Sequence, residues 1–206
     1  MKQYDDPASV DRSTVAHIAV PPAKRSLVEI RQLEELIPAD VALPQAVTVL
    51  RPNEEKDCDL VAELVHDGRL RMVFVMVHHE KYPIRVWLDA MGALNLHTGT
   101  VAEPVAPVLR AAAKAIQQEE YNGLKSGRGK DAIVQLVRAF AARGYPVDPE
   151  LWARAYFAIG GYFGHAGTIS ELVEEVRRGV RHRVKPAYRE DIYDILLAQS
   201  EDTGEA

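Results

Sequence analysis

The spacing of apolar residues in the first half of the chain changes from one segment to the next. After Ser26, apolar positions recur at helical spacing until Pro38 stops the pattern, which predicts a capped helix over residues 26–37. Ala46–Leu50 is a short apolar run typical of a strand. We therefore expect a helix followed by a strand in this part of the chain.

Residues 53–66 have two interpretations. Asn53 as N-cap, helically spaced apolar residues and Gly68 after the end predict a helix. Asp67 and Gly68 would alternatively form the turn of a hairpin between two strands. We favour the helix, because the apolar positions follow i, i+1, i+4, i+5 rather than alternating.

Two strands are expected next. Leu70–Val77 is a continuous apolar run, and Ile84–Leu88 would be its antiparallel neighbour across a turn at residues 80–83. Helical patterns dominate after residue 100. Five helices are expected there, at 104–121, 128–143, 149–159, 168–178 and from about 189 to 199.

The strongest helix starts in this half are Asp148-Pro149-Glu150 and the capping box Thr168-Ile-Ser-Glu171. The fold class is α+β: a small antiparallel sheet with helices in the N-terminal half, and a mostly helical C-terminal half. The expected divisions are an N-terminal arm (1–24), a small α+β subdomain (25–100), a helical subdomain (101–199) and a disordered acidic tail (200–206).

Composition limits the classes of function. The net charge of −5 argues against general coating by polyanions, so any contact with nucleic acid must be local. No apolar stretch approaches membrane-spanning length and the N-terminus lacks a secretory signal, so we expect a cytoplasmic protein. Cys58 is the lone cysteine, and its acidic neighbours should raise the thiol pKa, which argues against a nucleophile.

Positive charge is concentrated in residues 177–189, which hold six of the 25 Lys and Arg and none of the 30 Asp and Glu. In an extended chain Arg181, Arg183 and Lys185 would share one face, with Val180, His182 and Val184 on the other. We call these three cations the basic comb. Arginine suits bidentate binding of phosphate or carboxylate, and the nearby aromatic residues suited to stacking bases are Tyr162, Phe163 and Tyr188. The alternative is that acidic residues of the same chain, or of a second copy, neutralise the comb.

A glycine-rich segment, 160–167, precedes the capping box. Its free backbone donors and the helix start at Thr168 suit an anion, and His165 is a candidate donor or general base. If the chain folds back after Gly179, one anion site would contain Gly164, His165, Gly167 and Thr168 together with the comb. If it does not, an extended ligand would bind the comb alone, and the glycine segment would be a tight turn in which His165 makes a structural hydrogen bond.

Two further motifs are weaker. Gly127-Arg-Gly129-Lys130 lacks the spacing of a phosphate-binding loop and is interpreted as a linker between helices. His78 and Glu80, at the end of the apolar strand, would form a metal site if Asp89 or His97 joined them.

Three hypotheses follow from these patterns. The leading one is a cytoplasmic binding or regulatory protein with a local anion site in the helical half, whose partner is nucleic acid, a phosphorylated metabolite or an acidic protein segment, and not a membrane. The alternatives are a metal-assisted hydrolase at His78 and Glu80, and a structural homo-oligomer with the basic run at the subunit interface.

Overall fold

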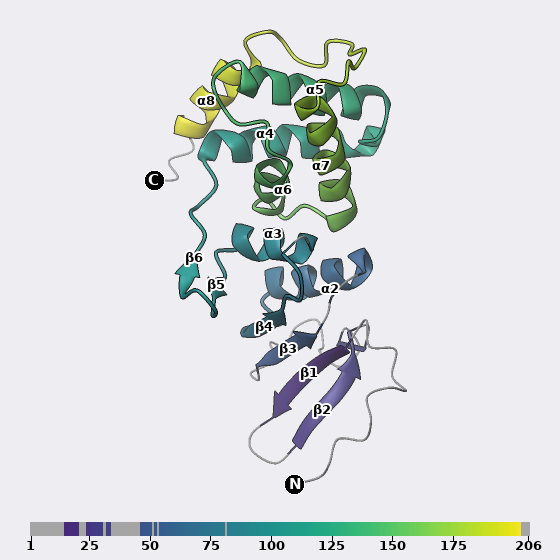
Figure 1. Cartoon of the computed structure of the whole chain (residues 1–206), viewed down its shortest axis with the longest axis vertical. Helices are drawn as coiled ribbons and strands as arrows, with labels where there is room; N and C mark the ends of the chain where they lie inside the picture. Colours follow the sequence, from purple (N-terminus) through teal and green to yellow (C-terminus); the bar gives the residue numbers. More distant parts are fainter. Residues whose placement is uncertain are drawn as a thin grey trace. The chain divides into compact units, whose positions relative to one another are not determined.

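The structure is a computed structural model that describes residues 15–20, 24–30, 32–33, 46–50, 52, 54–80 and 82–202 (Figure 1). The fold is α+β, with small sheets in the N-terminal part and helices in the C-terminal half. The chain separates into two compact units between Arg85 and Val86. Each unit is described by itself.

The first unit contains a four-stranded sheet in the order β2-β1-β3-β4. Its strands are β1 (Val15–Val20), β2 (Lys24–Glu29), β3 (Val47–Leu50) and β4 (Val73–Met76). β1 is antiparallel to both β2 and β3, whereas β3 and β4 are parallel and pair Val47 with Val73. The sheet is therefore mixed and not purely antiparallel.

Two expectations fail in this sheet. The helix predicted over 26–37 is wrong at its start, because Lys24–Glu29 is strand β2 paired along its length with β1. A short apolar run fits either period, and pairing with a neighbouring strand decides between them. Val15–Val20, which we expected in an N-terminal arm, is strand β1 of the same sheet. The remainder of the expected arm lies largely outside the described residues.

The helix interpretation of residues 53–66 is confirmed. α2 (Glu55–His66) begins after Glu54 rather than Asn53, and Asp67 caps its end by donating its N–H to the carbonyl of Glu63. It is followed by Gly68 at φ +69°. The buried face of α2 includes Cys58, Val61 and Leu64.

The strand expected at Ile84–Leu88 is wrong. The structure has α3 (Pro83–Ala90) there, with proline in its first turn. Ile84 and Trp87 are buried, and their three-residue separation places them on one face of a helix. Five residues were too few for the sequence to show that period.

The second unit contains a two-stranded antiparallel sheet and then the helices. The elements are β5 (Leu94–Asn95), β6 (Thr100–Val101), α4 (Pro107–Gln117), the 3-10 helix η2 (Glu120–Asn122), α5 (Gly127–Ala141), α6 (Pro149–Phe157), α7 (Phe163–Arg177) and α8 (Ile192–Asp202). Phe140 of α5 lies at the centre of an aromatic cluster, with ring centroids 5.3 Å from Trp152 and 5.0 Å from Tyr193.

The helix ends predicted in this unit agree with the structure in one case and differ from it in others. α6 begins as predicted, because the Asp148 carboxylate accepts the N–H of Glu150 at 3.0 Å. α7 begins at Phe163 and not at Thr168, so the predicted capping box lies inside the helix. α8 continues to Asp202, so the first residues of the expected disordered tail are helical, and residues 203–206 lie outside the described part.

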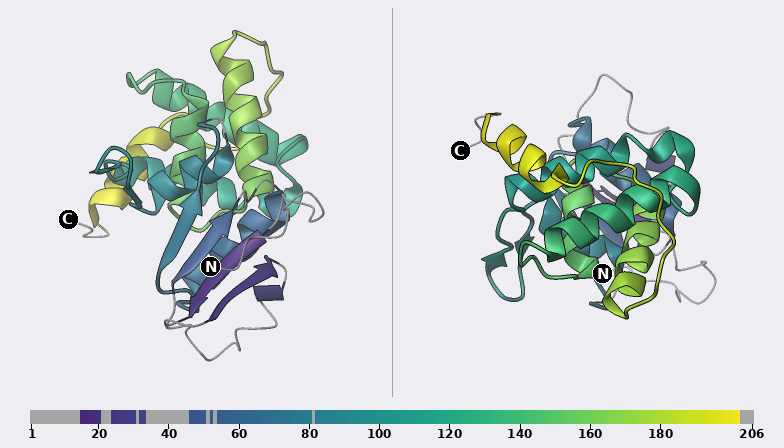
Figure 2. Two further views of the ribbon diagram at one scale, coloured as in Figure 1. Left: turned by 60° about the horizontal axis from the view of Figure 1, so that its bottom comes forward. Right: turned by 90° about the horizontal axis from the view of Figure 1, so that it is seen from above.

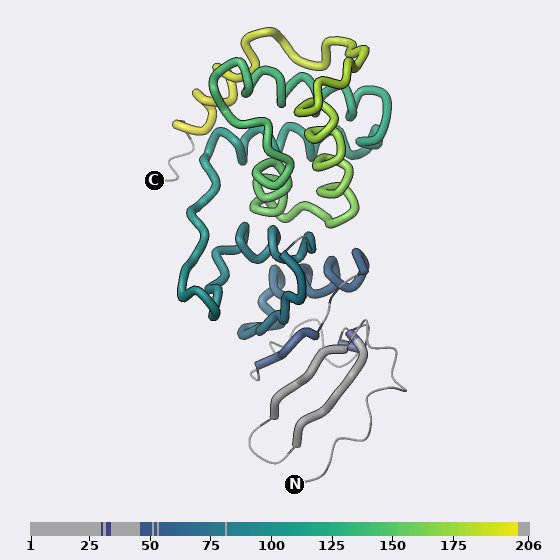
Figure 3. Tube along the Cα trace, viewed as in Figure 1, coloured from purple at the N-terminus to yellow at the C-terminus, as the bar shows by residue number. Residues whose placement is uncertain are grey.

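The connection from α7 to α8, residues 179–191, has no regular secondary structure. It runs along the outer side of α5, as the view from above in Figure 2 and the trace in Figure 3 show. No helix in the described part of the chain is both long enough and apolar enough to cross a membrane.

Candidate functional site

The basic comb has the alternating exposure predicted from the sequence. Arg181, Arg183 and Lys185 are exposed, while His182 and Val184 between them are half-buried. The His182 side chain is only 6% exposed, and its Nε2 lies 3.5 Å from Oε2 of Glu175 in α7. The three cations therefore point to solvent from one side of the connection. Val180 departs from the pattern, since it is exposed rather than part of the apolar back.

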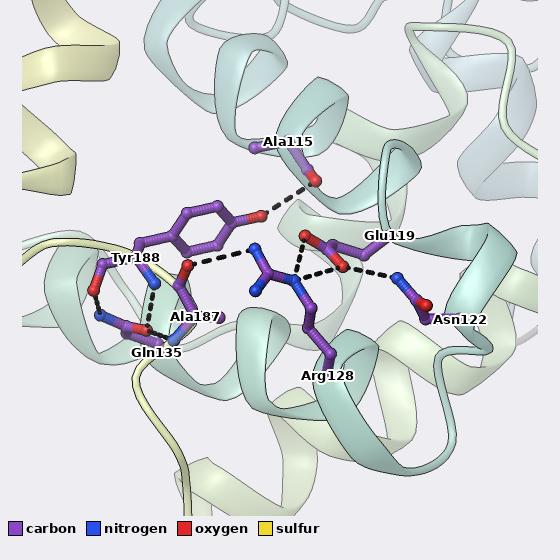
Figure 4. A network of polar contacts seen from close by, with 7 residues as sticks. All are labelled: Ala115, Glu119, Asn122, Arg128, Gln135, Ala187 and Tyr188. Carbon is purple, nitrogen blue, oxygen red and sulfur yellow. Dashed lines mark hydrogen bonds and ion pairs between the residues drawn. The ribbon is translucent and has the colours of Figure 1, made fainter.

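Side chains of α5 hold the end of the comb and the residues that follow it; Figure 4 shows the contacts of Gln135 with Ala187 and Tyr188. The Oε1 atom of Gln135 accepts the N–H groups of Ala187 at 2.9 Å and Tyr188 at 3.0 Å, and its Nε2 donates to the Tyr188 carbonyl at 2.7 Å. One turn earlier, Asp131 Oδ2 accepts the N–H of Lys185 at 3.2 Å. Two α5 side chains thus bind the backbone in place of a neighbouring strand.

Arg128 ties the same connection to the end of α4. Its Nε donates to both carboxylate oxygens of Glu119, at 2.9 and 3.0 Å, and its Nη2 donates to the carbonyl of Ala187 at 3.4 Å (Figure 4). Asn122 donates to the same carboxylate at 3.0 Å. Glu119 is 7% exposed, so this arginine compensates a largely buried negative charge.

The comb cations differ from their neighbours in pairing. Arg177 forms an ion pair with Glu174 at 2.7 Å, and Arg189 with Asp191 at 2.8 Å. Over the described residues, the side chains of Arg181, Arg183 and Lys185 form neither an ion pair nor a hydrogen bond. Their charges are therefore open to an external anion, and nothing in this part of the chain neutralises them by direct contact.

An open pocket lies where the comb meets the start of α5. Its volume is about 350 Å³, and it is lined by Gly127, Arg128, Asp131, Lys185, Pro186 and Ala187. The glycine motif interpreted as a linker is thus the first turn of α5. Gly129 is required there by close packing, because a Cβ atom would lie 2.2 Å from the carbonyl oxygen of Gly123.

Thr168 is not at a helix start. It is 5% exposed inside α7, and its hydroxyl donates to the carbonyl of Gly164 at 3.2 Å. Gly164 and Gly167 also lie within the helix. The helix start expected at Thr168 is therefore wrong, because α7 begins five residues earlier. The N–H groups of Gly167 and Thr168 bond within the helix, whereas Gly164 lies in its first turn, where backbone N–H groups lack an intrahelical acceptor.

The comb does not fold back to these residues. It begins beside the last turns of α7, where the N–H of Val180 donates to Glu175 and His182 contacts the same residue, and then follows α5. The part of α7 from Thr168 to its end at Arg177, about 14 Å of helix, separates the two groups. The composite site is not formed, which leaves the other branch of the expectation, an extended ligand on the comb alone.

His165 has a polar environment of its own. Its Nδ1 lies 3.2 Å from the Tyr156 hydroxyl and 3.5 Å from Oε2 of Glu120. The Tyr156 hydroxyl donates to Glu120, and burial together with this carboxylate raises the pKa of Tyr156 far above its ordinary value. Gly161 lies against the Tyr156 ring so closely that a Cβ atom would be 2.1 Å from it. These contacts fit the structural alternative, in which His165 hydrogen bonds beside a tight turn.

The sequence-based metal site is not formed. β4 ends at Met76, before His78 and Glu80, and Asp89 lies on a helix where a strand was expected. Within the ranges that the structure describes, no group of three or more His, Cys, Asp or Glu side chains converges.

The sequence patterns did not identify the residues that hold the comb. Asp131 and Gln135 interrupt the apolar stripe of α5 four residues apart, which places them on one face. That spacing was the available signal, but their partners are more than fifty residues away in the chain.

None of the protein-family models, curated proteins or solved structures compared with the chain matches it. The comb and the residues that hold it are therefore the basis on which a function is inferred.

Proposed function

We propose that this protein is a cytoplasmic binding protein that holds an extended polyanion on the basic comb. The observation that carries the proposal is the free state of the three cations: each is exposed, and none forms an ion pair among the described residues. In an acidic protein with a net charge of −5, an array of unpaired cations is a local site of attraction for anions.

The spacing of the comb supports an extended ligand. Alternate residues of an extended chain lie about 6.6 Å apart on one side. Successive phosphates along a stretched nucleic-acid strand have a comparable spacing, those of polyphosphate lie closer together, and a single small phosphate would reach only one or two of the cations. Two of the three are arginines, which bind phosphate oxygens in a bidentate manner.

The contacts with α5 support binding by preorganisation. Asp131 and Gln135 hold the backbone of residues 185–188 before any ligand arrives. A backbone that is already ordered loses less conformational entropy when it binds, so more of the interaction energy remains as affinity.

The test is the salt dependence of polyanion binding. Labelled oligothymidylate and inorganic polyphosphate are titrated with the protein at several salt concentrations. Neutralising three phosphates of a single strand predicts a slope of log K against log salt of about −2. The double variant Arg181→Ala/Arg183→Ala should reduce the slope by about 1.4 and weaken binding.

A matched control removes the same charge elsewhere in the unit. Lys114 of α4 and Arg138 of α5 are exposed. The variant Lys114→Ala/Arg138→Ala should bind both polyanions nearly as the unaltered protein does. Absence of binding at low salt, or an equal loss in the two double variants, would refute the proposal. A change in oligomeric size on removing the comb, without any polyanion binding, would make the comb a subunit contact instead.

A further inference from the structure

One aromatic side chain beside the comb is almost completely exposed. Tyr121 is 97% exposed, the highest value among the large hydrophobic side chains in the part of the chain described. It lies in η2, between α4 and α5. Its ring and hydroxyl take part in no ring contact or hydrogen bond among the described residues. Tyr121 therefore adds nothing to the packing of the unit.

The backbone that carries this ring is held firmly on both sides. Glu119 and Asn122 hydrogen bond to each other, and Glu119 accepts two bonds from Arg128. Glu120 accepts the hydroxyl of buried Tyr156. A free ring on an anchored backbone gives a flat surface that needs no rearrangement before binding.

The same arginine connects this ring to the comb. Arg128 donates to Glu119, two residues before Tyr121, and to the carbonyl of Ala187, two residues after Lys185 (Figure 4). Tyr121 and the comb thus belong to neighbouring segments joined through one side chain. A strand lying along the comb would have to pass Ala187 and Arg128 to reach the ring of Tyr121.

The aromatic residues suggested by the sequence are less suitable. Phe163 is 2% exposed, and the Tyr188 hydroxyl donates to the Ala115 carbonyl at 3.0 Å (Figure 4). Tyr162 is 47% exposed but lies at the start of α7, the end away from the comb.

We propose that Tyr121 is a stacking platform for a nucleobase, and that the polyanion held by the comb is a single-stranded nucleic acid. This inference rests on the proposed function. A row of cations with an adjacent exposed aromatic ring is the combination by which single strands are bound without sequence preference. A duplex keeps its base faces stacked inside, and a base-free polyanion has none, so neither would use the ring.

The acidic residues beside Tyr121 do not oppose this. The Glu119 carboxylate is neutralised by Arg128 and is largely buried. The Glu120 carboxylate accepts the Tyr156 hydroxyl and lies 3.5 Å from Nδ1 of His165. Both are engaged within the unit.

The experiment compares three probes of equal phosphate number: oligothymidylate, a duplex of half its length and inorganic polyphosphate. Tyr121→Ala should weaken oligothymidylate binding about tenfold, from the loss of one stacked base, and leave polyphosphate binding unchanged. Tyr121→Phe keeps the ring and should bind as the unaltered protein does. The melting temperature of all three proteins should agree, because the ring is not packed.

The outcomes separate the two proposals. If Tyr121→Ala binds oligothymidylate as tightly as the unaltered protein, or if the duplex binds equally well, the stacking inference is wrong. The comb proposal then survives if polyphosphate binding still depends on Arg181 and Arg183. If the unaltered protein binds none of the three probes, the proposed function itself fails.

Discussion

Gln135 makes more hydrogen bonds to the connection that carries the comb than Asp131 does. Its amide makes three hydrogen bonds to the backbone of Ala187 and Tyr188. Replacing it by alanine removes all three without adding bulk or charge. We expect Gln135→Ala to release the connection from α5 while the helical core stays folded, because the side chain is only part-buried.

The size of the effect follows from the bonds. Each hydrogen bond contributes about 1 kcal/mol net, so three set an upper limit of about 3 kcal/mol. Ala187 and Tyr188 are half-buried, so water can replace part of this, and a local loss of about 1–2 kcal/mol is expected. At tenfold per 1.4 kcal/mol, the amides of these two residues should exchange about 5 to 30 times faster.

Native-state hydrogen exchange at these two amides is the direct assay. Gln135→Glu keeps the accepting oxygens but cannot donate to the Tyr188 carbonyl, so its effect on the two amides should be smaller. Arg138→Ala, at an exposed position on the same helix, should leave both rates unchanged. Equal exchange rates in the unaltered protein and Gln135→Ala would refute the view that this amide holds the comb.

Three other predictions concern packing and titration. Gly129→Ala should lower the free energy of unfolding by about 1–3 kcal/mol in denaturant titration, because the new methyl group meets the backbone of Gly123. This loss should exceed the gain from the higher helix propensity of alanine, and unchanged stability would contradict the prediction. The Cys58 thiol, whose pKa is raised to about 12 by burial and then by Asp59 and Asp57, should react with a thiol reagent at pH 8 only as fast as the protein opens; immediate reaction would show that it is accessible. Burial raises the pKa of Tyr188 from 10.0 to about 12, so its contribution to stability is complete below pH 10 and is lost as the pH rises towards 12. The unaltered protein should therefore lose more stability between pH 10 and 12 than Tyr188→Phe does. If the stability of the two proteins falls equally with pH, the pKa of Tyr188 is not raised.

The elements that the sequence predicted correctly have their signals close together. α6 follows from Asp148, Pro149 and Glu150, three consecutive residues that cap and start a helix. β2 and α3 were wrong because their apolar runs span fewer residues than either period needs, and strand pairing or helix packing chose the outcome. Inside α7, Thr168 has the chemistry of a cap, but its hydroxyl bonds to the carbonyl four residues earlier, as Thr side chains do within helices.

In the candidate site too, the local features were predicted and the long-range contacts were not. The alternation of Arg181, Arg183 and Lys185 is a local property and was predicted, because extended chains place alternate residues on opposite sides. The contacts that hold these residues could not be predicted, because Gln135 and Arg128 meet the connection only after α5 and α8 have packed. Tyr121 gave no signal of its own, because exposure of a single ring depends on the surrounding fold.

The parallel pairing of β3 with β4 has a consequence for how the chain folds. A parallel pair cannot close through a tight turn, so residues 51–72, α2 included, must be placed before Val47 meets Val73. β1 must likewise wait for β3, because Val15 pairs with Leu50. In the second unit, α6 and α7 are sequence neighbours that pack against each other. Closing long loops slows folding, so the helical unit should reach its structure sooner than the sheet, although ribosomes make it last.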